Sequence, residues 1–358
     1  MLLRSLAYSA RLLLSVTLLS ALVACGGGGG SGGGGGDGGG TGNQPPTTGT
    51  PVGQLLFHDI SFRETYLGKA NASSAATLLT TDGDPAMWPD GNQYLEYKIG
   101  GGGNGADQIT VYATANRQVI YQLNNVPYFC GANIRPSPVS KKQIVVQCYQ
   151  NFLSNEGLVA VFDLEAGSVV YYEAAQPRRY KYRWLPDGRL LRVHDETGAL
   201  AVKSVGSTAW QSLGQIALPS GRRIFKFEVN PQGTMLALAF QGYSDFAEEE
   251  IAGISDIWVS KIDGSSLEQF TAIGYAYDPT WSPDGSHIAF ALDTSRYCSS
   301  SLSPCPGAPY LWYAPASARN MANILDGFAH PSATQFRRRY PSGNVSPLVG
   351  VSLRAWVQ

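Results

Sequence analysis

A chain of 358 residues with 26 basic and 27 acidic side chains carries almost no net charge, which excludes the strongly basic surface that nucleic-acid binding requires. Its 42 glycines, 21 prolines and 19 tyrosines favour turns and strands over helices. The length suffices for one large β domain or two small ones, so the order of the predicted elements decides between them.

The first 24 residues are typical of an export signal. Arg4 and Arg11 form a basic start, and the apolar run that follows is too short for a membrane-spanning helix. The run closes on Leu22-Val23-Ala24-Cys25, which resembles the lipobox of bacterial lipoproteins. That resemblance implies cleavage before Cys25 and attachment of diacylglycerol to its sulfur. Gly26, rather than aspartate, comes next, and the sorting rule of these lipoproteins then implies the outer membrane, with the side that the domain faces left open.

A flexible tether is predicted after the lipidated cysteine. Glycine fills most of the segment from Gly26 to Gly42, and three prolines stiffen the stretch up to Pro51. Such a segment cannot bury enough apolar surface to offset the entropy that ordering it would cost. We therefore divide the chain into a signal peptide at 1–24, a lipidated tether at 25–53 and a folded domain at 54–358.

A proline turn that leads into an apolar strand recurs along the folded domain. Its clearest copy is Trp281-Ser282-Pro283-Asp284-Gly285, followed by Ile288-Ala289-Phe290. Proline presets φ at the first turn position, aspartate accepts a local hydrogen bond and glycine adopts a left-handed conformation. The turn prolines, which stand 45 to 52 residues apart, are Pro89, Pro138, Pro186, Pro231 and Pro283. This period fits one four-stranded propeller blade, and a degenerate sixth copy is predicted at Pro347.

A second hairpin follows each proline hairpin, as at Asp256 to Ser265. The copy at Tyr66 to Ser74 has no proline turn before it, whereas the chain reaches Gln358 on the first half of a unit. We therefore predict an all-β, six-bladed propeller of four-stranded blades in which one blade is closed by both chain ends.

The turn at Trp281 to Gly285 and the hairpin at Ile257 to Gly264 together resemble the repeat of TolB-like propellers. The resemblance extends over about Leu55 to Gln358. It implies a propeller fold and a binding role in the cell envelope. The sequence departs from TolB in lacking an α/β domain before the propeller and in its predicted lipid anchor.

Four cysteines besides Cys25 predict disulfides, because the chain is expected to leave the cytoplasm. Cys298 and Cys305 lie in one insertion, and Cys130 and Cys148 flank one proline hairpin. We favour these two pairings among the three that are possible. A metal site is the alternative, but the four histidines are scattered and no close pairs of ligands occur, so we expect neither a metal nor a cofactor.

The connections between the second and third strands of the blades are long and irregular, and all are expected on the face opposite the proline turns. They carry aromatic residues of the kind that is enriched at interfaces. The candidate binding residues are Tyr149, Phe152, Tyr243, Phe246 and Tyr297. An acidic rim that includes Asp256 borders them. Local packing of these aromatic side chains is the alternative interpretation.

The expected function is that of a membrane-anchored envelope lipoprotein whose propeller is a non-catalytic scaffold for a protein or another ligand. A protein partner in the envelope is expected, and no nucleic acid. The alternative is a propeller-type hydrolase, lyase or dehydrogenase that acts on a carbohydrate or a lactone. We predict no catalytic residue, because the folded domain has no Gly-x-Ser-x-Gly motif and no cluster of histidines, and we place His287 at the surface.

Overall fold

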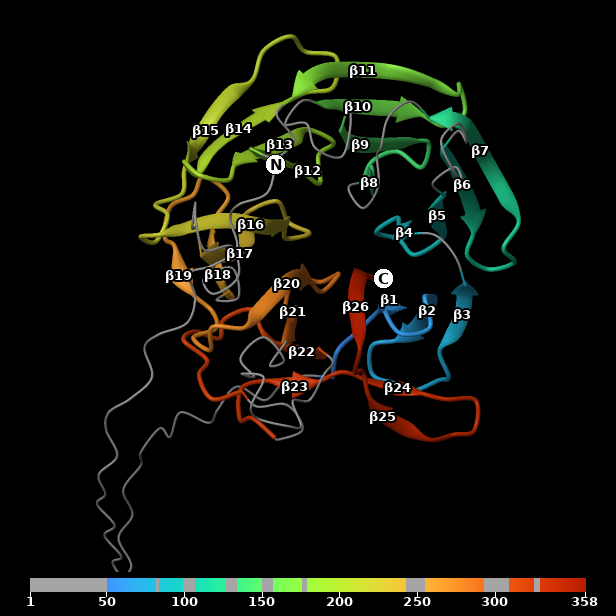
Figure 1. The fold of residues 1–358 in the computed structure, drawn as a ribbon, viewed down its shortest axis with the longest axis vertical. Coiled ribbons are helices and arrows are strands. Elements are labelled where there is room, and N and C mark those ends of the chain that lie inside the picture. The colour runs from blue at the N-terminus through green and yellow to red at the C-terminus, as the bar shows by residue number, and fades with distance from the viewer. Residues whose placement is uncertain are drawn as a thin grey trace, which may run out of the picture. The chain divides into compact units, whose positions relative to one another are not determined.

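The computed structural model describes residues 50–81, 84–98, 107–126, 134–149, 157–175, 179–242, 255–292, 309–324 and 329–358. These residues form six four-stranded antiparallel sheets and one two-stranded sheet. The six larger sheets are the blades of a ring, which Figure 1 shows viewed along its axis. The predicted six-bladed propeller is therefore confirmed. Within the described ranges, no helix has the length and apolar character needed to cross a bilayer.

Each of five blades is built from four consecutive strands, with the innermost strand first. The first of them contains β4 (Asp84–Met87), β5 (Gln93–Lys98), β6 (Asp107–Ala113) and β7 (Val119–Val126). The second contains β8 (Ile134–Pro136), β9 (Gln143–Tyr149), β10 (Gly157–Asp163) and β11 (Ser168–Ala175). The third contains β12 (Tyr180–Trp184), β13 (Leu190–His194), β14 (Ala199–Lys203) and β15 (Gln211–Gln215).

The remaining two consecutive blades follow the same plan. One contains β16 (Arg222–Val229), β17 (Met235–Gly242), β18 (Ser255–Lys261) and β19 (Glu268–Gln269). The other contains β20 (Ala276–Trp281), β21 (His287–Leu292), β22 (Tyr310–Pro315) and β23 (Thr334–Gln335). The innermost strand of each of these five blades runs toward a proline turn.

Both ends of the described chain form the closing blade, whose strands from inside outward are β26 (Val351–Val357), β1 (Gln54–Asp59), β2 (Glu64–Lys69) and β3 (Thr77–Thr80). Strands β1 and β26 pair antiparallel, with Gln54 opposite Val357. The side-chain amide of Gln54 donates to the Gln358 carbonyl at 3.1 Å, and Trp356 Nε1 donates to the Val52 carbonyl at 2.7 Å. The predicted closure is confirmed, but the two ends supply three strands and one strand rather than equal halves.

An additional hairpin separates β23 from β26. It consists of β24 (Arg337–Arg339) and β25 (Val345–Pro347), with Pro347 paired to Arg337. The sixth proline turn predicted at Pro347 is therefore wrong. The physical reason is that the two chain ends meet where the first and second strands of the closing blade would otherwise be joined, so this blade needs no turn there.

The other five proline turns join the first and second strands of their blades, as predicted. In the clearest copy, Asp284 Oδ1 accepts a hydrogen bond from the Ser286 N–H at 3.0 Å, and Gly285 has a φ of +74°. Both features recur at Asp90-Gly91 and Asp187-Gly188. The motif therefore forms a tight turn that reverses the chain at the same end of each of these five blades.

The hydrophobic core lies between neighbouring blades. In β21, for example, every residue from Ile288 to Leu292 is buried, so the strand is apolar on both faces. Continuous apolar runs of this kind are typical of strands that are covered on both sides. Trp88, Phe227 and Trp312 are among the largest side chains that are fully buried. The blades therefore form a rigid ring that positions the ends of the innermost strands around its axis.

Candidate functional site

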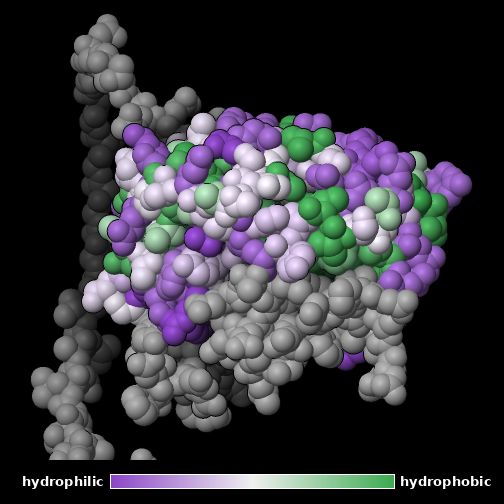
Figure 2. Space-filling model, turned by 90° about the horizontal axis from the view of Figure 1, so that it is seen from above, coloured by the Kyte–Doolittle hydropathy of each residue, from purple (hydrophilic) through white to green (hydrophobic). Residues whose placement is uncertain are grey.

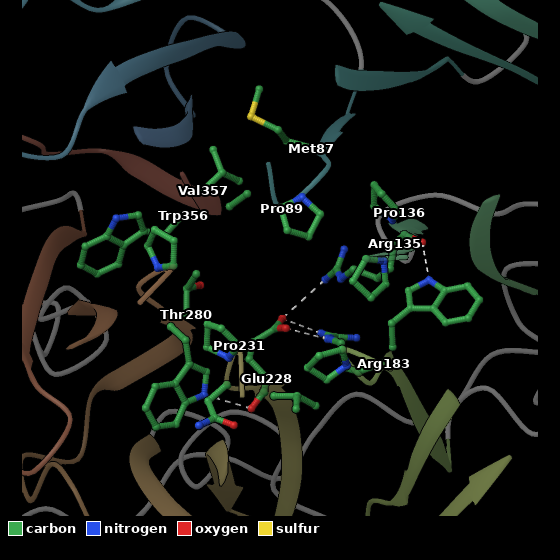
Figure 3. Close-up of a pocket in the computed structure, with 18 of the residues that line it drawn as sticks. Met87, Pro89, Arg135, Pro136, Arg183, Glu228, Pro231, Thr280, Trp356 and Val357 are labelled. Atoms are coloured by element: carbon green, nitrogen blue, oxygen red, sulfur yellow. Dashed lines mark hydrogen bonds and ion pairs between the residues drawn. The ribbon is translucent and has the colours of Figure 1, made fainter. Parts of the chain in front are cut away.

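A cavity of about 430 Å³ opens at the centre of the ring, on the face that carries the proline turns. All six blades contribute to its wall, and Figure 3 shows the lining side chains. The five turn prolines surround its mouth: Pro89, Pro138, Pro186, Pro231 and Pro283. Val357 and Gln358 line the cavity from the closing blade. The motif that sets the repeat therefore also forms the rim of the cavity.

Three charged side chains from consecutive blades point toward one another in this cavity (Figure 3). Arg183 contacts both carboxylate oxygens of Glu228, from Nε at 3.0 Å and from Nη2 at 2.9 Å. Arg135 lies farther away, 3.9 Å from Glu228 Oε1. The Arg183 guanidinium also lies over the ring of Phe227, 5.3 Å from its centroid. Arg183 is thus fixed by a bidentate ion pair and an aromatic contact.

The environment keeps Glu228 ionised. Burial works to raise its pKa, but the nearby charges of Arg183, Arg135 and Lys226 outweigh burial and hold the pKa below the usual value of a glutamate. A general acid at neutral pH needs a raised pKa instead. Glu228 is therefore suited to orient the arginines rather than to donate a proton.

Tryptophans of the repeat fix the backbone that presents these charges. Trp184 Nε1 donates to the carbonyl of Arg135 at 2.9 Å, and Trp281 Nε1 donates to the carbonyl of Glu228 at 3.2 Å. In each case the indole belongs to the blade that follows its acceptor. The same side chains that mark the repeat in the sequence therefore position the cavity wall.

A second, narrower cavity of about 40 Å³ lies beside the first. Arg135 and Arg354 line both cavities. The narrow cavity is also lined by Lys226 and Asp278, whose charged atoms are 3.2 Å apart. Among the side chains that line the two cavities, four are cationic and two are anionic. The two cavities together, which we call the channel, therefore carry an excess of positively charged side chains.

Most of the predicted binding and modification residues lie outside the described ranges. These are Cys25, Cys130, Phe152, Tyr243, Phe246, Tyr297, Cys298 and Cys305. Cys148 and Tyr149 are the last two residues of β9. The disulfide pairings, the lipidation and the aromatic binding face therefore stay predictions.

The face opposite the proline turns contains, in its described part, apolar residues that sequence reasoning missed. The turn between β1 and β2 joins the second and third strands of the closing blade, and there Ile60 is 54 % exposed and Phe62 is 72 % exposed. These two residues could have been noticed because their turn occupies the same position in its blade as the loops chosen from the sequence.

One expectation about a surface residue is wrong. Asp256 is buried, and its Oδ1 accepts hydrogen bonds from Thr271 Oγ1 and from the backbone of Ile273 and Gly274, so it stabilises a turn. His287 is partly exposed, and its ring makes a T-shaped contact with the ring of Tyr313. Neither contact could be predicted from the local sequence, because the partners lie in other strands or turns.

Strand β11 forms the outer edge of its blade, and it exposes Val169, Val170 and Tyr172. Figure 2 shows this side of the ring, where apolar areas are small and lie among polar residues. In the part of the chain that the structure describes, no group of three histidine, cysteine or acidic residues could hold a metal ion. The cationic cavity is therefore the candidate site that the structure itself supplies.

No protein-family model and no curated protein matches the chain. Solved structures that resemble it include a TolB candidate from Agrobacterium tumefaciens, with 15% identity, a TM-score of 0.47 and coverage of 85% of this chain and 99% of the other. A candidate 6-phosphogluconolactonase from Bacteroides uniformis has 10% identity, a TM-score of 0.46 and coverage of 85% and 97%. The GH74 enzyme of Niastella koreensis has 8% identity, a TM-score of 0.49 and coverage of 76% and 46%. These similarities concern the fold alone.

The charged cavity was not predicted from the sequence, although a signal for it exists. Four of its lining residues stand three positions before a turn proline: Arg135, Arg183, Glu228 and Thr280. Because the residue at this position changes from blade to blade, it does not belong to the repeat motif. Its importance follows only from the closure of the ring, which brings these positions together.

Proposed function

We propose that this protein is a lipid-anchored lipoprotein of the bacterial cell envelope whose propeller is a non-catalytic binding scaffold. The observation that carries the binding role is the cationic cavity with its rim of five prolines. Its shape is concave and preformed, and it combines an apolar rim with a few fixed polar groups, as ligand sites usually do. The ligand enters through the mouth that the proline turns form.

The charges of the cavity favour binding over acid–base catalysis. Glu228 is held ionised by Arg183, and Asp278 is engaged by Lys226. Carboxylates with such partners serve to orient cations. The arginines then present hydrogen-bond donors in a fixed geometry to an acidic group.

The anchor is supported by the lipobox-like sequence that ends at Cys25 and by the glycine-rich segment after it. The mature protein purified from cell envelopes should begin at Cys25 and carry diacylglycerol, which mass spectrometry of its N-terminal peptide detects. A Cys25→Ser variant should lose the lipid and leave the membrane fraction. An N-terminal peptide without added lipid in the native protein would contradict the anchor.

The binding role is tested by blocking the cavity. Thr280 lines the cavity, and Thr280→Trp obstructs it, whereas Thr77→Trp places the same bulk on the exposed edge strand β3. Full-length wild type and Thr77→Trp, purified in detergent from envelopes, should retain the same stoichiometric ligand or partner, and Thr280→Trp should lose it. Retention by Thr280→Trp contradicts the proposal, as does turnover of a sugar or lactone that this substitution abolishes.

A further inference from the structure

The order of residues along the innermost strands gives their depth in the channel. Strands β8, β16 and β20 all run toward the proline turns, so residues farther before a proline lie deeper, at about 3.3 Å per residue. Arg135 and Glu228 stand three positions before their prolines, and Lys226 and Asp278 stand five positions before theirs. The narrow cavity is therefore the inner end of the wide one, and Arg135 and Arg354 flank the passage between them.

The size of the inner end limits what can enter it. Its volume of about 40 Å³ holds only about three water molecules, because one buried water needs about 10–15 Å³ of such volume. The passage thus admits one small polar group. The wide cavity of about 430 Å³ has room for the body of an organic molecule.

Charge decides the sign of that polar group. Arg183 and Lys226 contact the two carboxylates of the channel, Glu228 and Asp278. Arg135, which lies 3.9 Å from Glu228 Oε1, and Arg354 add two positive charges where they line both cavities. An acidic group at this point would be attracted by both guanidinium groups, which match carboxylate and phosphate oxygens equally well.

The walls above the passage are suited to an apolar body. Five proline rings surround the mouth, and Met87 and Val357 also line the wide cavity (Figure 3). Proline rings are rigid. The protein therefore loses little conformational entropy when a flat or aliphatic ligand group packs on them.

We propose that the channel binds a small organic acid whose single carboxylate or phosphate lies between Arg135 and Arg354 and whose apolar body packs on the proline rim. This inference rests on the proposed function, because it names the chemical class of ligand for the same cavity. An acidic protein segment is the other occupant to consider. The small volume of the inner end, which has room for one head group, favours the small acid.

The test uses the full-length protein in detergent and isothermal titration calorimetry with defined probes. Benzoate and phenyl phosphate carry both a head group and a body, whereas acetate and inorganic phosphate lack the body and benzyl alcohol lacks the charge. We expect at least one of the first two probes to bind about tenfold or more tightly than its counterpart without the body and than benzyl alcohol. The tighter of the two identifies carboxylate or phosphate as the preferred head group.

Variants locate the binding. Arg354→Gln should weaken the tighter probe about tenfold or more, because a charge-assisted hydrogen bond is lost. Arg63→Gln removes the same charge from the turn between β1 and β2, on the opposite face, and should leave binding unchanged. Equal losses in the two variants, or equal affinity for benzyl alcohol, overturn the inference.

The outcomes separate this inference from the proposed function. Loss of the native ligand in Thr280→Trp, with no binding of either aromatic acid to the wild type, overturns the small-acid inference and leaves the binding scaffold standing. Binding of an aromatic acid that depends on Arg354, with the native partner retained by Thr280→Trp, supports the inference as a property of the cavity and contradicts the proposed route of partner binding.

Discussion

His287 shows how a single residue can make the stability of the propeller depend on pH. Burial lowers its pKa, against the opposing charge of Asp284. The unfolded chain, with a histidine pKa of about 6.5, therefore binds the proton at a higher pH than the folded chain does. The contribution of neutral His287 is present above about pH 6.5 and is lost as the pH falls toward the folded pKa.

Replacement of His287 by glutamine should remove this dependence. The fall in the free energy of unfolding between pH 7.5 and pH 5.5, measured by urea denaturation, should be smaller in His287→Gln than in the wild type. A fall of the same size in both proteins would show that other groups, such as His194 with its lowered pKa, account for the effect. Glu228 also has a lowered pKa, so its own contribution is lost only at more acidic pH.

At the scale of the element, the proline turn was predicted from the sequence, but the contacts that its residues make with other blades were not. Proline, aspartate and glycine act within a few residues, so the turns, the hairpins and the repeat were readable from Trp281 to Gly285 and its copies. The role of the motif tryptophan was not readable, because its acceptor lies in another blade. The prediction of a turn at Pro347 was wrong for a similar reason, because Pro347 lies in β25, which pairs with β24.

The bond between Trp184 and the Arg135 carbonyl can be tested with a matched pair of substitutions. Trp184→Phe removes that hydrogen bond, whereas Trp312→Phe removes an indole whose Nε1 has no hydrogen-bond partner within the described part of the chain. Both changes delete the same atoms from buried side chains. Trp184→Phe should destabilise the protein by about 1 kcal/mol more than Trp312→Phe, measured as the free energy of unfolding in urea. An equal or reversed order would mean that packing alone accounts for both tryptophans.

At the scale of the whole molecule, closure of the ring depends on a close approach of the two chain ends. A Cβ atom on Gly53, which has a φ of +87°, would lie 2.2 Å from the Val357 carbonyl oxygen. Gly206 has a similar φ of +85°, but a Cβ atom there would have nothing within 4 Å. The two glycines thus differ in their surroundings and not in their backbone conformation.

This pair gives a test of closure. Gly206→Ala should cost about 1 kcal/mol, because of the left-handed conformation alone. Gly53→Ala should cost at least about 2 kcal/mol more, because the backbone of β26 must move away from the seam. Thermal or urea unfolding of the full-length variants measures both changes. Equal costs would show that the seam between Val52 and Trp356 does not limit stability.

Closure also explains why the candidate site escaped sequence reasoning. The channel residues come from strands that lie far apart in the chain, and each is an ordinary charged residue in its own strand. Only the ring places Arg135, Arg354 and Glu228 around one cavity. The loops chosen from the sequence were selected by their length and aromatic content, which are local properties, and the channel has no such local signal.

The most direct measurement of the central claim, that the closed ring creates an acid-binding channel, is a crystal structure of the protein with 4-iodobenzoate, read from the anomalous signal of iodine. The account predicts an iodine peak within the rim of five prolines and carboxylate density between Arg135 and Arg354. Iodine sites confined to the outer surface, with the channel containing only solvent at saturating 4-iodobenzoate, would contradict it.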